Sequence, residues 1–438
     1  MYRAVKGTRD ILPDQSAVWQ VLEGSVRRVF ERYGFAEIRT PVLEETALFQ
    51  RSIGETTDVV SKEMYTLVDR KGRSLALRPE NTAPVVRACL EHHLMHGRTS
   101  LKLYYIGPMF RYERPQQGRL RQFSQAGAEV IGRDDPMADA ELIEMLLAWL
   151  GELGLEGATL RLSSVGCAVC RPDYVRALRE AMAPHLPGLC EDCRRRYQEN
   201  PLRMLDCKVA EDQAVLARAP SPGDYLCAAC REHFAEVRRL LGKAGIEAPV
   251  DPRLVRGLDY YTRTTFEVVA AGGVGAQSAV LGGGRYDGLF ETLGGPPTPA
   301  LGFAVGLERL LMALPGAQTA APGLDLYLVH QGELGFERAL ELARRLRGSG
   351  LRLDLEGPGK PLKAQMREAS RRAARYALIV GENEIESGRY QLKRLADGEQ
   401  VALGLETIEQ RLLAENRGAG TQGASPPQRG SAAGGGGG

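Results

Sequence analysis

The sequence predicts an α+β protein built from three folded parts. A mostly antiparallel sheet flanked by helices is expected from residues 1–167 and 251–314, because strand-like apolar runs follow one another there without helices between them. Residues 168–250 have helical patterns and few strand signals, which indicates a helical insertion domain. Alternating strands and helices over residues 324–412 predict an α/β domain, and a Gly-, Ala- and Ser-rich tail at 416–438 is expected to be disordered.

The first elements of the sheet domain follow from local patterns. A helix starts after Pro13 and repeats apolar residues on one face, and Gly34 is placed to end it. The following run, as far as Glu44, suits a strand that Pro41 confines to an edge or an end of the sheet. A hairpin is expected at 64–78, where two apolar runs flank a turn that contains glycine.

Two longer strands are expected at Leu101–Phe110 and Gln122–Ile131, joined by a long loop. After the insertion the sheet resumes at Arg256 and ends near residue 313, and a linker rich in Ala, Pro and Gly follows at 315–323. In the C-terminal domain, strands are expected at 326–329, 352–355 and 376–380, with helices at 336–347 and 361–374.

Composition and charge limit the classes of function. The chain has 438 residues, of which 43% are hydrophobic and 26% are charged, as in ordinary globular proteins. Its net charge of +2 excludes a broadly basic nucleic-acid coat, so any nucleic acid must bind to local patches. The sequence has neither an apolar run long enough to span a membrane nor an apolar leader, which predicts a cytoplasmic protein without a membrane partner.

The strand pair at 101–131 carries the densest group of chemically active side chains. Phe123, Gln125 and Glu129 are separated by even numbers, so an extended strand places them on one face. That face offers an aromatic ring, an amide and a carboxylate, and Arg111 can supply a guanidinium that binds phosphate in bidentate fashion. The alternative is a solvated hairpin face with ordinary charge pairs.

Three further segments contain charged residues together with aromatic residues or glycine. Arg256–Thr262 places an arginine and an aspartate beside two tyrosines, which indicates either the floor of a polar ligand pocket or a surface turn. The triple glycine in 281–289 lets backbone approach a ligand, although flexible loops are also rich in glycine. A strand and then a helix are expected at 300–310, and Arg309 in the first turn of that helix can face a phosphate. The glycine-rich sequence that starts at Leu281 matches neither a Walker A motif nor a Rossmann fingerprint.

These segments together resemble the bacterial histidyl-tRNA synthetases, which are class II aminoacyl-tRNA synthetases. The resemblance covers about residues 1–412 and has two departures: Asn81 stands where relatives most often carry Gly, and Ser124 where they usually carry His. The matching segments are Lys6–Asp10, residues 34–44 as the dimer-interface motif 1, Leu77–Ala83, residues 110–129 as motif 2, Arg256–Thr262 as a string particular to the histidine enzymes, and residues 300–310 as motif 3.

The resemblance implies that ATP activates histidine, with Mg²⁺ bridging phosphate oxygens, and that histidine then passes to the 3′-terminal ribose of tRNA(His). The expected catalytic residues are Arg256 near the α-phosphate, with Arg111 and Arg309. The expected histidine pocket contains Glu80, Thr82, Arg111, Gln125, Glu129, Arg256, Tyr260, Tyr261 and Tyr286. The expected ATP site contains Arg111, Glu113, Arg119, Phe123 and Arg309, with Phe123 stacked under adenine.

The C-terminal domain is similar to the anticodon-binding domain of this family, and the family resemblance also implies a homodimer. Lys363, Arg367, Arg371 and Arg375 recur every fourth residue on a predicted helix, and this basic stripe is expected to contact tRNA phosphates. A solvated helix face is the alternative for the stripe. For the whole chain, the alternative is a catalytically inactive relative that acts as the regulatory subunit of ATP phosphoribosyltransferase, which generally lacks the Arg256–Thr262 string and this domain.

Seven of the eight cysteines lie between Cys167 and Cys230. In a chain without a leader, their spacing favours zinc or free thiols over disulfides. Two Cys-X-X-Cys pairs brought together would form a structural zinc site, and reduced thiols packed under helices are the alternative. The pairs with metal-like spacing are Cys167 and Cys170, Cys190 and Cys193, and Cys227 and Cys230.

Overall fold

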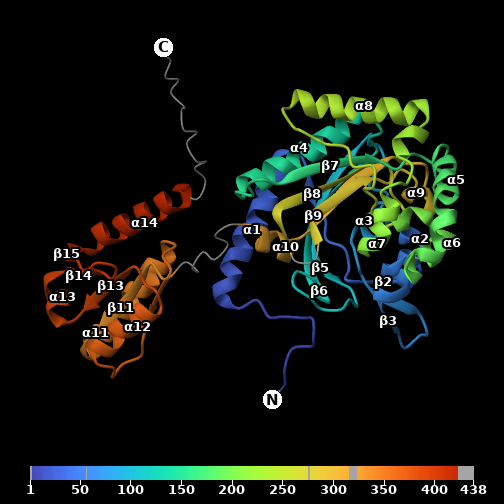
Figure 1. Cartoon of the computed structure of the whole chain (residues 1–438). Coiled ribbons are helices and arrows are strands. Elements are labelled where there is room, and N and C mark those ends of the chain that lie inside the picture. Colours follow the sequence, from blue (N-terminus) through green and yellow to red (C-terminus); the bar gives the residue numbers. More distant parts are fainter. Residues whose placement is uncertain (1, 56, 275–276, 315–322, 423–438) are drawn as a thin grey trace, which may run out of the picture. The chain divides into compact units, whose positions relative to one another are not determined.

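The computed structural model describes residues 2–55, 57–274, 277–314 and 323–422 (Figure 1). The chain forms two compact units, one that contains residues 18–314 and one that contains residues 323–422. Each unit has its own sheet and its own hydrophobic core. Within the described ranges, every helix is too short or too polar to cross a membrane.

A seven-stranded sheet forms the centre of the first unit (Figure 1). Strand β1 pairs with β5 in parallel, whereas the remaining neighbours are antiparallel, so the predicted fold class is confirmed. In spatial order the strands are β1 (Ala36–Glu37), β5 (Leu101–Phe110), β6 (Gln122–Ile131), β10 (Ala300–Gly306), β9 (Gln277–Arg285), β8 (Thr262–Val274) and β7 (Thr159–Ser164).

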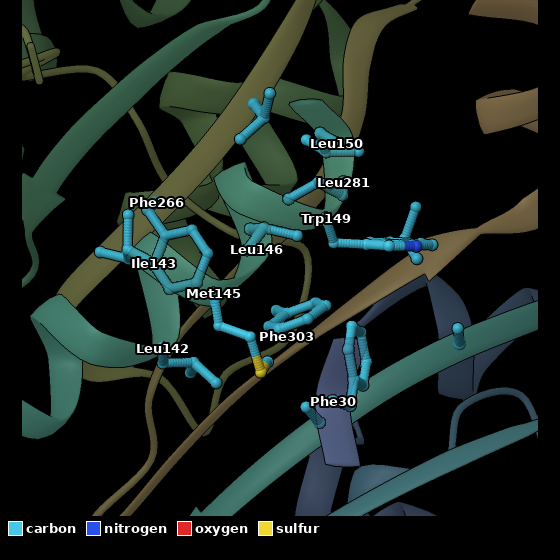
Figure 2. Packing of buried hydrophobic residues seen from close by; sticks show 14 of the residues in the cluster. Phe30, Leu142, Ile143, Met145, Leu146, Trp149, Leu150, Phe266, Leu281 and Phe303 are labelled. Carbon is cyan, nitrogen blue, oxygen red and sulfur yellow. The ribbon is translucent and has the colours of Figure 1, made fainter. Parts of the chain in front are cut away.

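Helices cover the sheet and bury the aromatic core that Figure 2 shows. The ring of Phe30 meets the rings of Trp149 and Phe303 edge to face, with centroids 5.4 Å and 5.8 Å away. Trp149 also donates a hydrogen bond of 2.8 Å from Nε1 to Ser25 Oγ, so its polar atom is satisfied inside the core. The helices that contribute to this core are α1 (Pro13–Arg32), α4 (Pro136–Glu152), α8 (Ala228–Lys243) and α10 (Leu307–Ala313).

A small three-stranded sheet precedes the long strands. The predicted hairpin is confirmed as β3 (Tyr65–Val68) and β4 (Ser74–Leu77). The single strand expected before Glu44 is instead two short strands, β1 and β2 (Leu43–Glu45), which belong to different sheets because Pro41 interrupts the pairing. The neighbouring helical segments are α2 (Thr46–Ile53), the π-helical turn η1 (Val59–Glu63), α3 (Thr82–Glu91) and α9 (Leu289–Thr292).

The helical insertion leaves the sheet after β7 and returns at β8, and these two strands pair with each other. It has a core of its own, built around Tyr174, Leu178 and Met204. Helix α8 closes the insertion and packs along α4 (Figure 1). The other segments are α5 (Arg171–Met182), α6 (Glu191–Glu199) and α7 (Ala210–Leu216), with 3₁₀ helices η2 (Ala183–Gly188), η3 (Pro201–Asp206) and η4 (Pro222–Tyr225).

A buried ion-pair network joins the insertion to the sheet. Arg285 is fully buried at the end of β9, and its Nε and Nη2 donate to the Asp139 carboxylate at 2.8 Å and 2.6 Å. Its remaining donors reach the carbonyl oxygens of Arg133 and Asp135 at 2.9 Å and 3.0 Å. His233 of α8 lies on the other side of the same carboxylate, with 3.3 Å between Nε2 and Oδ2.

The second unit contains a five-stranded sheet whose first three strands are parallel, as the α/β prediction requires. The predictions missed two antiparallel strands, and the expected tail began too early, because α14 continues through 416–422; residues 423–438 lie outside the described ranges. The elements are β11 (Leu326–His330), α11 (Gly332–Gly348), β12 (Leu353–Leu355), α12 (Leu362–Arg371), β13 (Tyr376–Val380), α13 (Glu382–Ser387), β14 (Arg389–Arg394), β15 (Gln400–Gly404) and α14 (Leu405–Gln422).

Candidate active site

A cavity of about 860 Å³ opens between the large sheet and the helical insertion. Arg111 reaches it from the end of β5, Arg256 from the segment before β8, and Arg309 from α10. Three guanidinium groups that are far apart in the sequence therefore surround one space. The other predicted site residues that line the cavity are Glu80, Thr82, Glu113, Arg119, Phe123, Gln125, Tyr260 and Tyr261.

The Arg111 guanidinium lies over the Phe123 ring on one wall of the cavity. The Arg111 guanidinium carbon lies 5.5 Å from the Phe123 ring centroid, and Nε donates to the carbonyl oxygen of Pro79 at 3.0 Å. The Glu113 carboxylate lies between two arginines, 3.9 Å from Arg111 Nη1 and 3.4 Å from Arg119 Nη1. This wall can bind a flat ring and an adjacent anion together.

Arg309 approaches the same space from α10. Its Nε donates to the carbonyl oxygen of Gly118 at 3.1 Å, and Nη1 lies 3.5 Å from that of Ala279. Burial, followed by the positive charge of Arg119, lowers the pKa of Arg309. A polyanion in the cavity would offset both effects, because it supplies negative charge where positive charges are gathered.

Arg256 is held against the glycine-rich strand β9. Its Nη1 donates to the Glu267 carboxylate. A Cβ atom on Gly282 would come within 2.3 Å of the Arg256 guanidinium carbon, and one on Gly302 would come within 1.7 Å of Glu129 Oε2. These glycines therefore make room for side chains of the protein itself, which differs from the sequence prediction of backbone contact with a ligand.

A polar pocket with two buried carboxylates adjoins the arginines. Glu80 accepts hydrogen bonds from the backbone N–H groups of Thr82 and Ala83 at 2.6 Å and 3.0 Å, which fixes it at the start of α3. Thr82 Oγ1 donates to Glu129 at 2.8 Å, and the Tyr286 hydroxyl donates to the same carboxylate at 2.5 Å. Glu129 and Tyr286 are buried directly behind the residues that line the cavity.

Burial sets the protonation of this pocket. It raises the pKa of Glu129 to about 8, and it also raises the pKa of Glu80. Both shifts mean that the protein gives the negative charges too little stabilisation by itself. Gln125 Oε1 is buried at the same place without a hydrogen-bond partner among the described residues. The pocket therefore suits a ligand that brings a cation and hydrogen-bond donors.

Comparison with known proteins identifies the family of the chain. The family model for histidyl-tRNA synthetase matches residues 7–310, and that for an anticodon-binding domain matches residues 327–415. The chain belongs to the histidyl-tRNA synthetase family. Two curated relatives, each named histidine–tRNA ligase, support this assignment. The relative from Syntrophotalea carbinolica is 51% identical over 94% of this chain and 99% of its own, and that from Koribacter versatilis is 52% identical over 92% and 94%.

Solved structures agree with this assignment. Apo histidyl-tRNA synthetase from Staphylococcus aureus superposes with a TM-score of 0.78 at 35% identity, covering 94% of this chain and all of its own. A Bacillus halodurans protein, titled as an ATP phosphoribosyltransferase regulatory subunit or histidyl-tRNA synthetase, is 23% identical with a TM-score of 0.64 over 87% of this chain and 98% of its own, so it shows the fold alone. The ligase names of the curated relatives favour the synthetase over the regulatory subunit.

In this histidyl-tRNA synthetase family member, the insertion supports the segment before β8. Arg203 donates to Asp259 Oδ1 at 3.1 Å and also to the carbonyl oxygen of Gly257. Asn200 donates to the same Asp259 atom at 3.0 Å, and Arg171 donates to the carbonyl oxygen of Tyr261. The sequence predictions missed these three donors, since a single sequence carries no signal for contacts between positions 54 to 90 residues apart.

The two departures from the family pattern have structural counterparts. Asn81 Oδ1 accepts hydrogen bonds from Thr40 Oγ1 at 2.6 Å and from the buried Arg78 at 3.0 Å. The Asn81 φ angle of −121° is open to any residue, so glycine is not required by the backbone there. At Ser124, the backbone N–H donates to both oxygens of Glu308 at 3.0 Å, a contact that is independent of the side chain.

In the second unit, Lys363, Arg367 and Arg371 are exposed on α12. Arg371 also forms an ion pair with Glu368. The stripe ends there, because α12 stops at Arg371. Arg375, expected to continue it, instead lies directly before β13 and donates to Asp325 at 3.2 Å.

Proposed function

We propose that this member of the histidyl-tRNA synthetase family activates L-histidine with ATP and transfers it to the 3′-terminal adenosine of tRNA(His). The observation that carries the proposal is the convergence of Arg111, Arg256 and Arg309 on one cavity beside a carboxylate-containing pocket. Guanidinium groups suit phosphates, and buried carboxylates suit the α-amino group and imidazole of histidine. The two halves of the cavity thus match the two substrates.

Histidine is assigned to the pocket at the start of α3. Glu80, Thr82, Gln125 and Tyr261 line it and offer acceptors and an aromatic wall. Glu129 supports Thr82 from behind and supplies negative charge, and Tyr260 packs against Tyr261 with 4.8 Å between ring centroids. Tyr286 acts by fixing the Glu129 carboxylate.

ATP is assigned to the arginine-lined wall. Phe123 stacks on adenine, while Arg111 and Arg309 bind phosphates, with Arg119 and Glu113 beside them. Mg²⁺ prefers oxygen ligands and supplies charge neutralisation on the triphosphate when bound. The carboxylate of Glu113 lines the cavity and is of the right chemical type to take part in its binding.

The first reaction is an in-line displacement at the α-phosphorus. A carboxylate oxygen of histidine forms a bond to phosphorus as the bond to the leaving pyrophosphate breaks. Arg256 stabilises the charge that develops on the α-phosphate oxygens, and the pocket holds the nucleophile in position. Transfer of the histidyl group to the ribose hydroxyl then releases AMP. Neither step needs a covalent bond to the protein.

Histidine-dependent exchange of pyrophosphate into ATP tests the first reaction. We expect exchange with L-histidine and Mg²⁺, and none above background with L-glutamine or L-phenylalanine, because neither carries the basic imidazole ring. Attachment of labelled histidine to tRNA(His) tests the second reaction. A pure, folded protein that exchanges no pyrophosphate at saturating histidine would contradict the proposal.

The pH dependence of histidine binding follows from Glu129. Because its pKa of about 8 leaves the carboxyl largely protonated at pH 7, binding of a cationic ligand lowers the pKa and releases a proton. We expect histidine affinity to rise with pH up to about 8 and then level off. Calorimetry in two buffers of different ionisation enthalpy measures the released proton. In Glu129→Gln, which retains a polar group of similar shape, this release should be absent while any proton change from the imidazole remains; equal release in both proteins refutes the assignment.

The C-terminal domain is assigned to tRNA binding through the α12 stripe. We expect Lys363→Glu combined with Arg367→Glu to weaken tRNA binding and to reduce the slope of log K against log salt by about 2, one for each lost phosphate contact. Pyrophosphate exchange should be unchanged. The control is Arg344→Glu, because Arg344 is an exposed basic residue on α11 outside the stripe. Its tRNA affinity should be closer to that of the wild type than the affinity of the double variant is. Loss of exchange in the double variant would show that the domain assignment is wrong.

Three further assignments complete the proposal. Residues 34–44 form a homodimer interface, which the exposed apolar side chain of Leu43 supports. The protein acts in the cytoplasm, which its eight unbridged cysteines support. Zinc is a structural component held by cysteines of the helical insertion.

A further inference from the structure

Two groups of potential metal ligands lie in the helical insertion. Their membership differs from what the spacing of the Cys-X-X-Cys pairs in the sequence predicts. Cys167 and Cys170 meet Cys227 and Cys230 in one group. Cys190 and Cys193 instead meet Cys207 and Asp212, two residues that the sequence predictions did not include. Within each group, all four ligand atoms lie within 4.8 Å of one another.

The four-cysteine group has the dimensions of a tetrahedral zinc site. Zinc–sulfur bonds of about 2.3 Å in a tetrahedron place sulfur atoms about 3.8 Å apart. The sulfur of Cys170 lies 3.8 Å from those of Cys167 and Cys230, and the sulfurs of Cys167 and Cys227 are 3.9 Å apart. A disulfide would need about 2.05 Å. Gly166 leaves room for this group, because a Cβ there would come within 2.8 Å of the Cys170 sulfur.

The second group contains a buried carboxylate without a cationic partner. Asp212 is 2% exposed, and among the described residues its side-chain partners are cysteines, with no Lys, Arg or His among them. Its neighbours are the Cys207 sulfur, 3.3 Å from Oδ2, and the backbone N–H of Cys190, 3.2 Å from each carboxylate oxygen. These donors hold the carboxylate in place, and one carboxylate with three cysteine sulfurs makes a four-ligand set of the types that zinc binds.

Both groups are attached to the segment that carries Arg256. Arg171 directly follows Cys170 and donates to the carbonyl oxygen of Tyr261. Arg203 lies four residues before Cys207 and donates to Gly257 and Asp259. The backbone between residues 257 and 261 is therefore held from the four-cysteine group at one end and from the second group at the other.

We propose that the insertion binds two structural zinc ions, one held by Cys167, Cys170, Cys227 and Cys230 and one by Cys190, Cys193, Cys207 and Asp212. Together they fix the segment that carries Arg256 and Tyr261. The link from the ions to the reaction cavity rests on the proposed function, whereas the ions themselves do not.

Metal content of the purified full-length protein tests the ligand sets. We expect about two zinc ions per chain in the wild type, one in Cys230→Ala and one in Cys207→Ala or Asp212→Ala. Cys89→Ala removes a buried cysteine that belongs to neither group and should leave two. Cobalt substitution should give a thiolate charge-transfer absorption, weaker in Cys230→Ala than in Asp212→Ala, because the former loses a site with four thiolates and the latter a site with three. A zinc content near zero in the wild-type protein would overturn the proposal without any variant. A wild-type content of one ion per chain that is lost only in Cys230→Ala would also overturn it.

The link to the cavity is tested separately with Arg203→Met, which leaves all eight ligands in place. We expect two zinc ions and a raised KM for histidine in pyrophosphate exchange. Two ions with unchanged kinetics would refute the link and leave the zinc sites standing. Absence of exchange in the wild type would refute the proposed function, and the metal count would still decide the sites.

Discussion

Replacing Arg256 by alanine is expected to lower the rate of histidine-dependent pyrophosphate exchange by about 10²–10³-fold, the range found when one preorganised charge-stabilising donor is removed. The reason is geometric. Arg256 is held by Glu267 and faces Gly282, so its guanidinium is fixed before the substrates bind. A fixed charge need not reorganise as charge develops on the α-phosphate, and the loss should therefore appear mainly in kcat.

Two comparisons make this measurement specific. Arg256→Lys keeps the charge but not the planar fork, and it should recover only part of the rate. Arg239→Ala removes an arginine from an exposed ion pair with Glu236 on α8, and it should exchange pyrophosphate at the wild-type rate. If Arg256→Ala and Arg239→Ala have equal rates, the role assigned to Arg256 is wrong. A change confined to the KM for ATP would assign Arg256 to ground-state binding instead.

The largest effect on stability is expected for Arg285→Met, at about 3–5 kcal/mol of unfolding free energy. Methionine fills similar space but leaves the Asp139 carboxylate buried without its guanidinium partner. It also leaves the carbonyl oxygens of Arg133 and Asp135 without their donors. Only the His233 ring, 3.3 Å away, would then remain beside this buried carboxylate, and breaking a buried ion pair is among the most destabilising changes that a single substitution can make.

Urea unfolding followed by tryptophan fluorescence measures this effect, because both tryptophans, Trp19 and Trp149, lie in the first unit. Arg161→Met breaks the exposed pair with Asp251 and should cost no more than about 1 kcal/mol. Arg285→Met combined with Asp139→Leu should be more stable than Arg285→Met alone, since the buried carboxylate that has lost its guanidinium partner is gone. Equal stability of Arg285→Met and the wild type would show that the network does not stabilise the fold.

Period and spacing were enough to predict much of the first unit. The alternation at Phe123, Gln125 and Glu129 placed these residues on one face of β6, and the structure has Phe123 and Gln125 in the cavity with Glu129 just behind it. Strands as long as β5 and β6 have enough residues for the alternation of side chains to be recognised even where single positions depart from it. Short strands such as β1 and β2 have too few residues for a period to be recognised.

The parts that sequence reasoning missed are those that depend on three-dimensional proximity. Pair spacing could not show that Cys190 and Cys193 meet Cys207 and Asp212, because the backbone path of α6, η3 and α7 decides it. The need for glycine at 282 and 302 likewise depends on which side chains lie opposite, namely Arg256 and Glu129. Resemblance to a family located the site, but only the fold shows which neighbours hold it.

Arg171, Asn200 and Arg203 donate hydrogen bonds to the segment 257–261, which precedes β8. These contacts limit how this enzyme can be re-engineered. The insertion departs and rejoins at adjacent strands, so it resembles a cassette that could be exchanged between relatives. An insertion taken from a relative would nevertheless lack matching donors in place of Asn200 and Arg203, and the Asp259 side chain would lose these hydrogen bonds. Chimeras should work only when the cassette and residues 256–262 are moved as one unit.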